Sequence, residues 1–437
     1  MTERRAGAEP FGPDELEWLL DLMAVASVSP FEGGKPELTL DAQQVFLAGA
    51  RERGWADVLH AAPPAAVLER ADVPAPVREA VQADPGLLAT QASAVVRMGR
   101  PADHRRRLVV NFHVDTVGPH VEPRLVDGVL HGRGAVDDKG PGIAAAAGIA
   151  AAFRDEPWLA DTIEVQLASV PGEEGGAMGT YGTRWLVEQG LTGRLMLFAE
   201  PTGGRVMDAC TAAMTPRLRV TGADTTDDHP AAGHNATVAL GFLADFLARR
   251  LGPVVHTLGA KLCVAGLHTG TSHNRVYGTG ELRMNIAYQD ARQAAAAERE
   301  LTALLPRARE EFAVAHAGNP LTARLVADWD EVVRLDWLKR GLPVLDNRDA
   351  AMEGLLAAAG LPRHDGRADG SAFTCDAIWA GGPDRYVAVC GPGGLDTHGA
   401  HTPGEFVELD LLARYARQIK ELVVRFGTHT AALEADR

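Results

Sequence analysis

The chain has few of the features that mark secreted, membrane or nucleic-acid-binding proteins. Its 437 residues include only four cysteines, scattered without a CxxC pair, which favours reduced thiols in a cytoplasmic protein. Aromatic residues make up 5% of the chain, and 43 basic residues face 58 acidic ones, so no nucleic-acid partner is expected. The formal net charge of -15 also opposes binding to anionic membranes.

Long hydrophobic runs are missing as well. The stretch Met1–Pro13 is polar and charged, so no signal peptide is expected. The most apolar low-complexity segment, Gly142–Phe153, is far shorter than the ~20 residues that a membrane span needs. Since 46% of the residues are hydrophobic, the chain can still bury a large core. We therefore expect a globular cytoplasmic protein.

Short apolar runs alternate with helical segments in the first and last parts of the chain. The runs expected to form buried strands are Leu108–Phe112, Ile163–Val170, Leu195–Ala199 and Tyr386–Cys390. An Ala-rich helix is expected at Ile143–Phe153, and the apolar spacing in Leu409–Phe426 predicts a final helix. This alternation predicts an α/β domain with a mixed, largely parallel sheet.

The middle of the chain has a different pattern. Strands are expected at Leu218–Thr221, Glu281–Tyr288 and Leu321–Val326, and helices at Ala236–Arg250 and Ala291–Phe312. This mixture predicts a small inserted α+β domain of ferredoxin-like type. The predicted division is residues 1–210 with 326–437 for the larger domain and residues 211–325 for the smaller one.

Acidic and histidine residues follow the predicted strands of the larger domain. They are His113 and Asp115 in FHVDT, Glu173 and Glu174 in VPGEEGG, Glu200 in FAEPT and His401 in GAHTPGEF, and Asp137 in GRGAVDDKGP joins them from just before the Ala-rich helix. Each alone could be a solvated loop residue or a helix cap. Together they lie where open α/β sheets place their sites, at the carboxyl ends of strands.

Two imidazoles with several carboxylates and no thiolate are typical ligands of zinc, cobalt or manganese in a catalytic site. If one carboxylate bridges two such ions, they can share a water, lower its pKa and polarise a carbonyl. A further carboxylate that is not a ligand can then act as general base.

These ordered motifs resemble the co-catalytic zinc metallopeptidase family of acetylornithine deacetylase, succinyl-diaminopimelate desuccinylase, aminoacylase-1, glutamate carboxypeptidase and the carnosinases. The resemblance covers roughly residues 15–426. It implies that one metal is held by His113, Asp137 and Glu200, and the other by Asp137, Glu174 and His401. It also implies Glu173 as the general base, Asp115 as the residue that orients His113, and the inserted domain as a lid that mediates homodimerisation.

Several residues in or near these motifs are not assigned to the metals, and for some of them two roles are open. Asp138 is not expected to be a ligand, and His398 is expected to be an exposed loop residue. Lys139, one of only five lysines, is expected in a structural ion pair near the metals, although it could be a simple charge at a helix start. Asp369, in RADGSAF, matches the Gly-Ser/Thr-Asp segment that lies near the substrate in the family, but a turn-forming Asp before Gly fits equally well.

The smaller domain departs from the family pattern. Thr226 stands where relatives have a histidine that stabilises the oxyanion, and His229 or His234 could replace it from a shifted loop. Ala287 stands where an arginine commonly holds a substrate carboxylate, and a methyl group cannot replace that pair. Asn274 and Arg275 are the remaining candidate substrate contacts, with Arg283 a further candidate on the face of Ala287.

Three functions follow from this pattern. The first is a two-metal amidohydrolase that cleaves a small C–N amide, such as an N-acyl amino acid or a dipeptide-like metabolite, with zinc the expected metal and cobalt or manganese possible. The second keeps the metals but catalyses a non-hydrolytic cyclisation, condensation or acyl transfer. The third is a binding or scaffold protein without catalysis, which the intact ligand set disfavours.

Overall fold

The computed structural model describes residues 8–435 and divides into two compact units, one running up to Cys210 and from Leu345 onward, the other spanning Thr211–Val344. The second unit passes the expected boundary at residue 325 because the strand β15 (Val333–Lys339) pairs with β10 (Ala212–Thr221) of the same unit. Within residues 8–435 no helix is both long enough and apolar enough to cross a membrane.

The first unit is built on an eight-stranded mixed sheet. In spatial order its strands are β1 (Ala56–Ala61), β2 (Ser93–Met98), β6 (Glu164–Val170), β3 (Arg107–His113), β7 (Leu195–Pro201), β18 (Tyr386–Gly391), β8 (Val206–Met207) and β17 (Arg363–His364). The four central strands β6, β3, β7 and β18 run parallel, and β1 and β2 are antiparallel to their neighbours. The prediction of a mixed, largely parallel sheet is confirmed. The four central strands also match the four apolar runs from which they were predicted, except that Ile163 lies just before β6.

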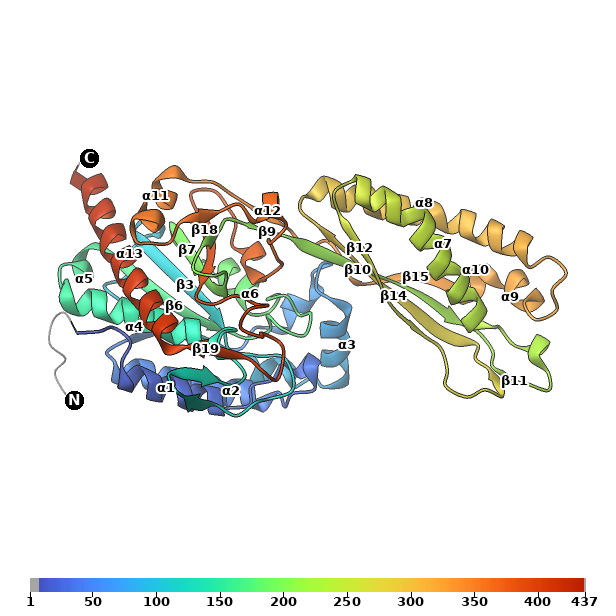
Figure 1. Ribbon diagram of the computed structural model, residues 1–437, viewed down its shortest axis with the longest axis horizontal. Coiled ribbons are helices and arrows are strands. Elements are labelled where there is room, and N and C mark those ends of the chain that lie inside the picture. Colours follow the sequence, from blue (N-terminus) through green and yellow to red (C-terminus); the bar gives the residue numbers. More distant parts are fainter. Residues whose placement is uncertain (1–7, 436–437) are drawn as a thin grey trace. The chain divides into compact units, whose positions relative to one another are not determined.

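Helices cover this sheet (Figure 1). They are α1 (Pro13–Ala24), α2 (Glu37–Glu52), α3 (Ala75–Ala83), α4 (Lys139–Asp155), α5 (Leu159–Thr162), α6 (Thr183–Glu188), α11 (Ala350–Ala358), α12 (Gly366–Asp369) and α13 (Leu409–Ala435). Short 3-10 helices are η1 (Pro30–Glu32), η2 (Ala65–Glu69), η3 (Leu87–Thr90), η4 (His104–Arg106) and η6 (Asp376–Trp379). Two small sheets complete the unit, one of β4 (Arg124–Val126), β5 (Val129–His131) and β19 (Phe406–Glu408), the other of β9 (Ala209–Cys210) and β16 (Leu345–Asp346).

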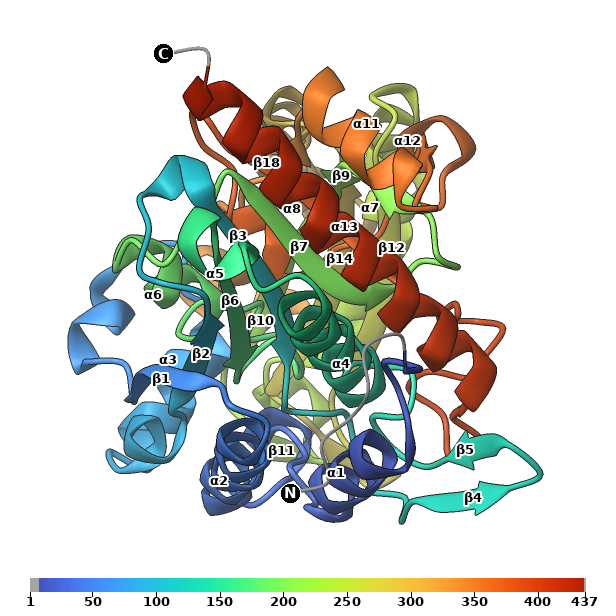
Figure 2. The ribbon, with the colours of Figure 1, turned by 90° about the vertical axis from the view of Figure 1, so that its left-hand side faces the viewer.

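The helices α4 and α13 pack against each other over the central strands (Figure 2). Small residues in α4 allow this close packing, since a Cβ added at Gly142 would lie 2.4 Å from the ring of Phe112 in β3, and one at Gly148 would lie 2.3 Å from the backbone of Ala416 in α13. The apolar stripe of α13 is buried, including Tyr415. The core therefore fixes the central strands, from whose carboxyl ends the candidate site is built.

The second unit is a four-stranded antiparallel sheet with helices (Figure 1). The sheet has the order β12 (Lys261–His268), β14 (Thr279–Tyr288), β10, β15, and the main helices are α7 (Ala236–Thr257) and α8 (Ala291–Ala315). Smaller elements are β11 (Thr225–Thr226), β13 (Arg275–Val276), η5 (Pro230–Ala232), α9 (Ala323–Ala327) and α10 (Trp329–Val332). The chain order of strands and main helices is β-α-β-β-α-β, the ferredoxin-like arrangement that was expected.

One predicted element of the second unit is wrong. The strand expected at Leu321–Val326 is instead part of a turn and the short helix α9. In this segment Leu325 is buried whereas Leu321 is 45% exposed, so no alternating apolar face is available to join the sheet.

Candidate metal centre

The side chains of five predicted ligands come together at the carboxyl ends of the central strands. His113 is the last residue of β3, and Glu200 lies near the end of β7. Asp137 lies two residues before the start of α4, Glu174 follows β6, and His401 follows β18. Ligand atoms of His113, Asp137 and Glu200 lie within 4.8 Å of one another, and so do those of Asp137, Glu174 and His401.

The Asp137 carboxylate is shared by both groups. Its Oδ1 lies 2.9 Å from Nε2 of His113, and its Oδ2 lies 3.0 Å from Nε2 of His401. On the two far sides, Oε1 of Glu200 is 3.8 Å from Nε2 of His113, and Oε1 of Glu174 is 3.1 Å from Nε2 of His401. One carboxylate thus presents one oxygen to each imidazole, which is the arrangement that a bridging ligand requires.

The carboxylates of this cluster are buried, so their negative charges are costly unless positive charge lies nearby. Burial and the charge of Asp137 raise the pKa of Glu200 well above its usual range, and burial and the charge of Glu174 do the same for the pKa of Glu173. The buried carboxylate oxygens of Asp138 have no hydrogen-bond partner among the described residues, and burial raises the pKa of Asp138 as well. Buried charges of one sign are stabilised by pairing or by metal coordination, so this donor set fits divalent cations.

Asp115 holds the loop that follows β6. Its carboxylate accepts hydrogen bonds from the backbone N–H groups of Gly172, Glu173 and Glu174, at 2.9, 3.3 and 3.2 Å. Its backbone carbonyl accepts the Nδ1–H of His113 at 2.7 Å, which leaves Nε2 of His113 facing Asp137. Asp115 therefore orients His113 through its carbonyl and positions Glu173 and Glu174 through its carboxylate.

Lys139 is not in the ion pair that was expected. Its Nζ donates to the backbone carbonyls of Leu22 and Val25, at 3.1 and 3.0 Å, at the end of α1. A cation there complements the negative end of the helix dipole. Burial lowers the pKa of Lys139 to about 7.

His398 and Asp369 lie outside the two groups. The ring of His398 contacts Glu408, with 3.1 Å between Nε2 and Oε2, and its side chain is only 14% exposed, so it is less open than expected. Asp369 ends α12 and accepts hydrogen bonds from the N–H and hydroxyl of Ser371, with His364 at 2.9 Å. These contacts agree with the reading of Asp369 as a turn residue.

The candidate substrate contacts of the second unit have local partners. Both ring nitrogens of His234 are used, since Nδ1 accepts the N–H of Ala223 and Nε2 lies 2.9 Å from Asp328. Arg275 pairs with Asp224, and His229 precedes η5 on the surface. Asn274 lies beside β13 and is exposed.

The remaining positions of the smaller domain lie on its strands. Thr226 lies in β11, opposite Arg275 in β13. Ala287 and Arg283 lie in β14 on the face opposite the buried Leu282, Met284 and Ile286, as strand alternation predicts.

Two buried acids near the centre were not singled out from the sequence. Asp376, at the start of η6, accepts a hydrogen bond from the hydroxyl of Thr183, and burial raises its pKa to about 6. Glu405 is fully enclosed and pairs with Arg133 at 2.5 Å. The only sequence signal for Glu405 was its place in AHTPGEF, and Asp376 followed no predicted strand.

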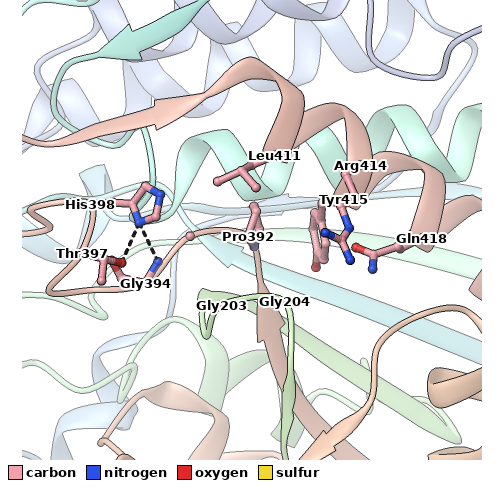
Figure 3. A pocket seen from close by; sticks show the side chains of 11 residues that line it. Gly203, Gly204, Pro392, Gly394, Thr397, His398, Leu411, Arg414, Tyr415 and Gln418 are labelled. Atoms are coloured by element: carbon pink, nitrogen blue, oxygen red, sulfur yellow. Dashed lines mark hydrogen bonds between the residues drawn. The ribbon is translucent and has the colours of Figure 1, made fainter.

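A cavity of about 260 Å³ lies behind two of the ligand-bearing loops (Figure 3). It is lined by Gly203, Gly204, Pro392, Gly393, Gly394, Thr397, His398, Leu411, Arg414, Tyr415 and Gln418. His398 is held on its wall by the N–H of Gly394 and by Thr397. The cavity is bounded by the loops that follow Glu200 and precede His401, so it is adjacent to the candidate centre without containing its ligands.

Comparison with known proteins agrees with this geometry. Residues 109–425 match the model of peptidase family M20/M25/M40. The chain is 29% identical over 179 residues to a putative LysW-lysine/LysW-ornithine hydrolase of Aeropyrum pernix, covering 41% of this chain and 46% of that protein. It is 30% identical over 219 residues to a succinyl-diaminopimelate desuccinylase of Stenotrophomonas maltophilia, covering 46% of this chain and 58% of that protein. The matched segments thus span about half the length of these curated relatives.

The fold is also shared with solved structures. A tripeptidase of Staphylococcus aureus superposes with a TM-score of 0.64 at 16% identity, over 95% of this chain and 98% of that one. Since the family model covers more than half of the chain, the resemblance inferred from the motifs is confirmed, and the chain belongs to peptidase family M20/M25/M40, a family of metal-dependent hydrolases.

Proposed function

We propose that this protein is a two-metal-dependent amidohydrolase that cleaves the C–N amide bond of a small N-acyl amino acid or dipeptide-like metabolite. The observation that carries the proposal is the position of the Asp137 carboxylate between His113 and His401, with one oxygen facing each. The family supports hydrolysis of an amide, since relatives bear the names of a desuccinylase and a lysine/ornithine hydrolase.

In this proposal His113, Asp137 and Glu200 hold one divalent ion, and Asp137, Glu174 and His401 hold the second. The mixture of imidazole and carboxylate favours zinc, with cobalt or manganese as other candidates. Ions bound there would acidify a water molecule and polarise the amide carbonyl.

Glu173 is the proposed general base. Its backbone is fixed by Asp115, and its carboxylate belongs to a group with His113 and Glu174 whose ligand atoms lie within 4.8 Å of one another. From that position it accepts the proton of the attacking water and returns it to the leaving amine. Asp115 acts as a positioning residue.

The second unit is proposed to supply substrate contacts and to form a homodimer. Arg275, Asn274 and His229 are its exposed candidates, and Arg275 would exchange Asp224 for an anionic substrate group. To contact a substrate, His234 would have to break both of its present hydrogen bonds. Asp369, in the first unit, would have to break its hydrogen bonds with Ser371. A cytoplasmic location agrees with four cysteines that form no disulfide. Light scattering of the purified protein tests the dimer.

The alternative function is non-hydrolytic chemistry on the same metals. It is favoured by Thr226 and Ala287, which stand where the family resemblance implies a histidine and an arginine. One experiment separates the two: zinc-loaded protein is incubated with a panel of N-acyl amino acids and dipeptides in ¹⁸O-labelled water. Hydrolysis puts solvent oxygen into the product acid, whereas a product that forms without the label supports cyclisation, condensation or acyl transfer. If the metal-loaded protein converts none of these compounds, the proposed substrate class is wrong.

A further inference from the structure

Two cysteine thiols lie side by side near Glu200 of the candidate metal centre. Cys210 ends the short strand β9, which pairs with β16, and Cys375 directly precedes η6. Their Sγ atoms are 3.8 Å apart, and the two residues are only 2% and 1% exposed. Although 165 positions separate them in sequence, the first unit places them together.

One thiol of the pair lies close to two buried carboxylates. Sγ of Cys375 and carboxylate oxygens of Glu200 and Asp376 all lie within 4.8 Å of one another. Asp376 is itself held by the hydroxyl of Thr183. Cys375 thus contacts the second thiol on one side and two carboxylates on the other, with the residues drawn from three segments, and Glu200 also faces His113.

The spacing of the sulfur atoms suits a tetrahedral metal. Zn–S bonds of about 2.3 Å at tetrahedral angles place two thiolates about 3.8 Å apart, and Zn–O bonds of about 2.0 Å place the mixed pairs slightly closer. A disulfide would instead require the sulfur atoms to approach to about 2.05 Å. Ligand atoms of Cys375, Glu200 and Asp376 already lie within 4.8 Å of one another, and Cys210 would join them through its contact with Cys375.

Charge around the centre favours a further cation. Seven carboxylates gather there: Asp115, Asp137, Asp138, Glu173, Glu174, Glu200 and Asp376. Two divalent ions held between His113 and His401 offset four of these charges. Asp376 and Glu200 lie within 4.8 Å of the Cys375 sulfur, so part of this negative charge is next to the thiols.

We propose that Cys210 and Cys375, with the carboxylates of Glu200 and Asp376, form a third site that binds a thiophilic divalent ion such as Zn²⁺ or Cd²⁺. The shared Glu200 would couple this site to the proposed two-metal centre. The inference does not require that the protein hydrolyse amides, because it concerns binding alone.

Cadmium titration of the metal-free, reduced protein tests the proposal. The wild type is expected to bind one more equivalent of Cd²⁺ than the double variant Cys210→Ser/Cys375→Ser and to develop thiolate-to-cadmium charge-transfer absorption in the ultraviolet. Cys263→Ser is the matched control, because Cys263 is exposed in β12 of the second unit, and it should keep both signals. Equal stoichiometry in wild type and double variant, or no charge-transfer absorption in the wild type, overturns the proposal.

A second measurement needs no variant and so does not depend on how the double variant folds. X-ray absorption at the zinc edge of wild-type protein loaded with three equivalents should show sulfur at about 2.3 Å. Scattering from nitrogen and oxygen alone contradicts the site. So does a Cys210–Cys375 disulfide in the zinc-loaded protein, detected by mass spectrometry as the loss of two hydrogens. The variant Glu173→Gln separates the two proposals. If it loses turnover but keeps the sulfur signal, the third site is supported independently of the hydrolytic mechanism.

Discussion

The carboxylate of Glu405 accepts a hydrogen bond from the backbone N–H of Asp137 at 3.2 Å. The same oxygen accepts the N–H groups of Gly134 and Val136, at 3.0 and 3.1 Å, and the other oxygen pairs with Arg133. A residue four positions after His401 thus fixes the backbone of the proposed bridging ligand. The loops that carry Asp137 and His401 are therefore held together before any metal binds.

Glu405→Gln should weaken metal binding. A glutamine has one acceptor oxygen, so it cannot accept the three N–H groups and also pair with Arg133. We expect the affinity for the metals to fall by about 10- to 100-fold, as for other residues that support ligands. Calorimetric titration with zinc measures the change. Glu408→Gln is the control, since Glu408 lies nearby and contacts His398 at the surface; equal effects of both variants would contradict the role of Glu405.

Asp115→Asn should impair turnover more than it disturbs His113. The carbonyl that accepts the His113 N–H is kept, whereas an amide NH₂ replaces one of the two oxygens that accept the N–H groups of residues 172–174. We expect kcat to fall by about 10- to 100-fold while at least one metal stays bound. Steady-state kinetics and elemental analysis test this. The same change at Asp103, which caps the exposed η4, should leave kcat unaltered, and an unaltered kcat in Asp115→Asn rules out the positioning role.

Metal binding should release protons. Hydrogen bonds to Asp137 and Glu174 raise the pKa of His401 to about 10, and, against the effect of burial, Asp137 raises the pKa of His113 well above its usual range. Below these pKa values both rings are protonated in the metal-free protein and must lose a proton to coordinate, so metal affinity rises with pH from neutrality towards pH 10. Calorimetry at pH 7 in buffers of different ionisation enthalpy should give at least about two protons released as the two sites fill, because Glu200, whose pKa is also raised, can add to the two from the histidines. A binding enthalpy independent of buffer would contradict this assignment.

Gly142→Ala should destabilise the first unit. A Cβ at this position of α4 would overlap the ring of Phe112, which packs under the helix. Overpacking of this kind costs about 1–3 kcal/mol of unfolding free energy. Gly354→Ala in α11 is the matched control, because its Cβ would meet nothing within 4 Å, and it should stabilise by up to about 1 kcal/mol. Urea unfolding distinguishes them; stabilisation by both changes would disprove the close packing of α4.

Much of the fold could be predicted because its central strands are continuous apolar runs. Residues 108–112 and 195–199 could hardly be anything except buried strands, and the structure has them in β3 and β7. The prediction of a strand at 321–326 was wrong because a short apolar segment does not show which of its side chains will be buried. Strand β15 was not predicted, although residues 333–337 alternate between apolar and charged side chains, and its Asp336 pairs with Arg217 and Arg219 across the sheet.

The site was predictable where a residue type and its place after a strand coincide. His113, Glu174 and Glu200 met both conditions, and each lies in one of the two ligand groups. The roles of Glu405 and Lys139 depend on backbone groups far along the chain, at residues 134–137 and at the end of α1, and no local pattern encodes such contacts. The Cys210–Cys375 pair likewise arises only from tertiary folding.

The most direct test of the proposed mechanism compares Glu173→Gln with wild type in metal content and turnover. Glu173 is proposed to move a proton without holding a metal, and its N–H contact with Asp115 involves only the backbone, which the substitution preserves. We predict two bound metals per chain in both proteins and a kcat lower by about 10²- to 10⁴-fold in the variant, on whichever N-acyl substrate the wild type hydrolyses. Unchanged turnover in the metal-loaded variant would contradict the account.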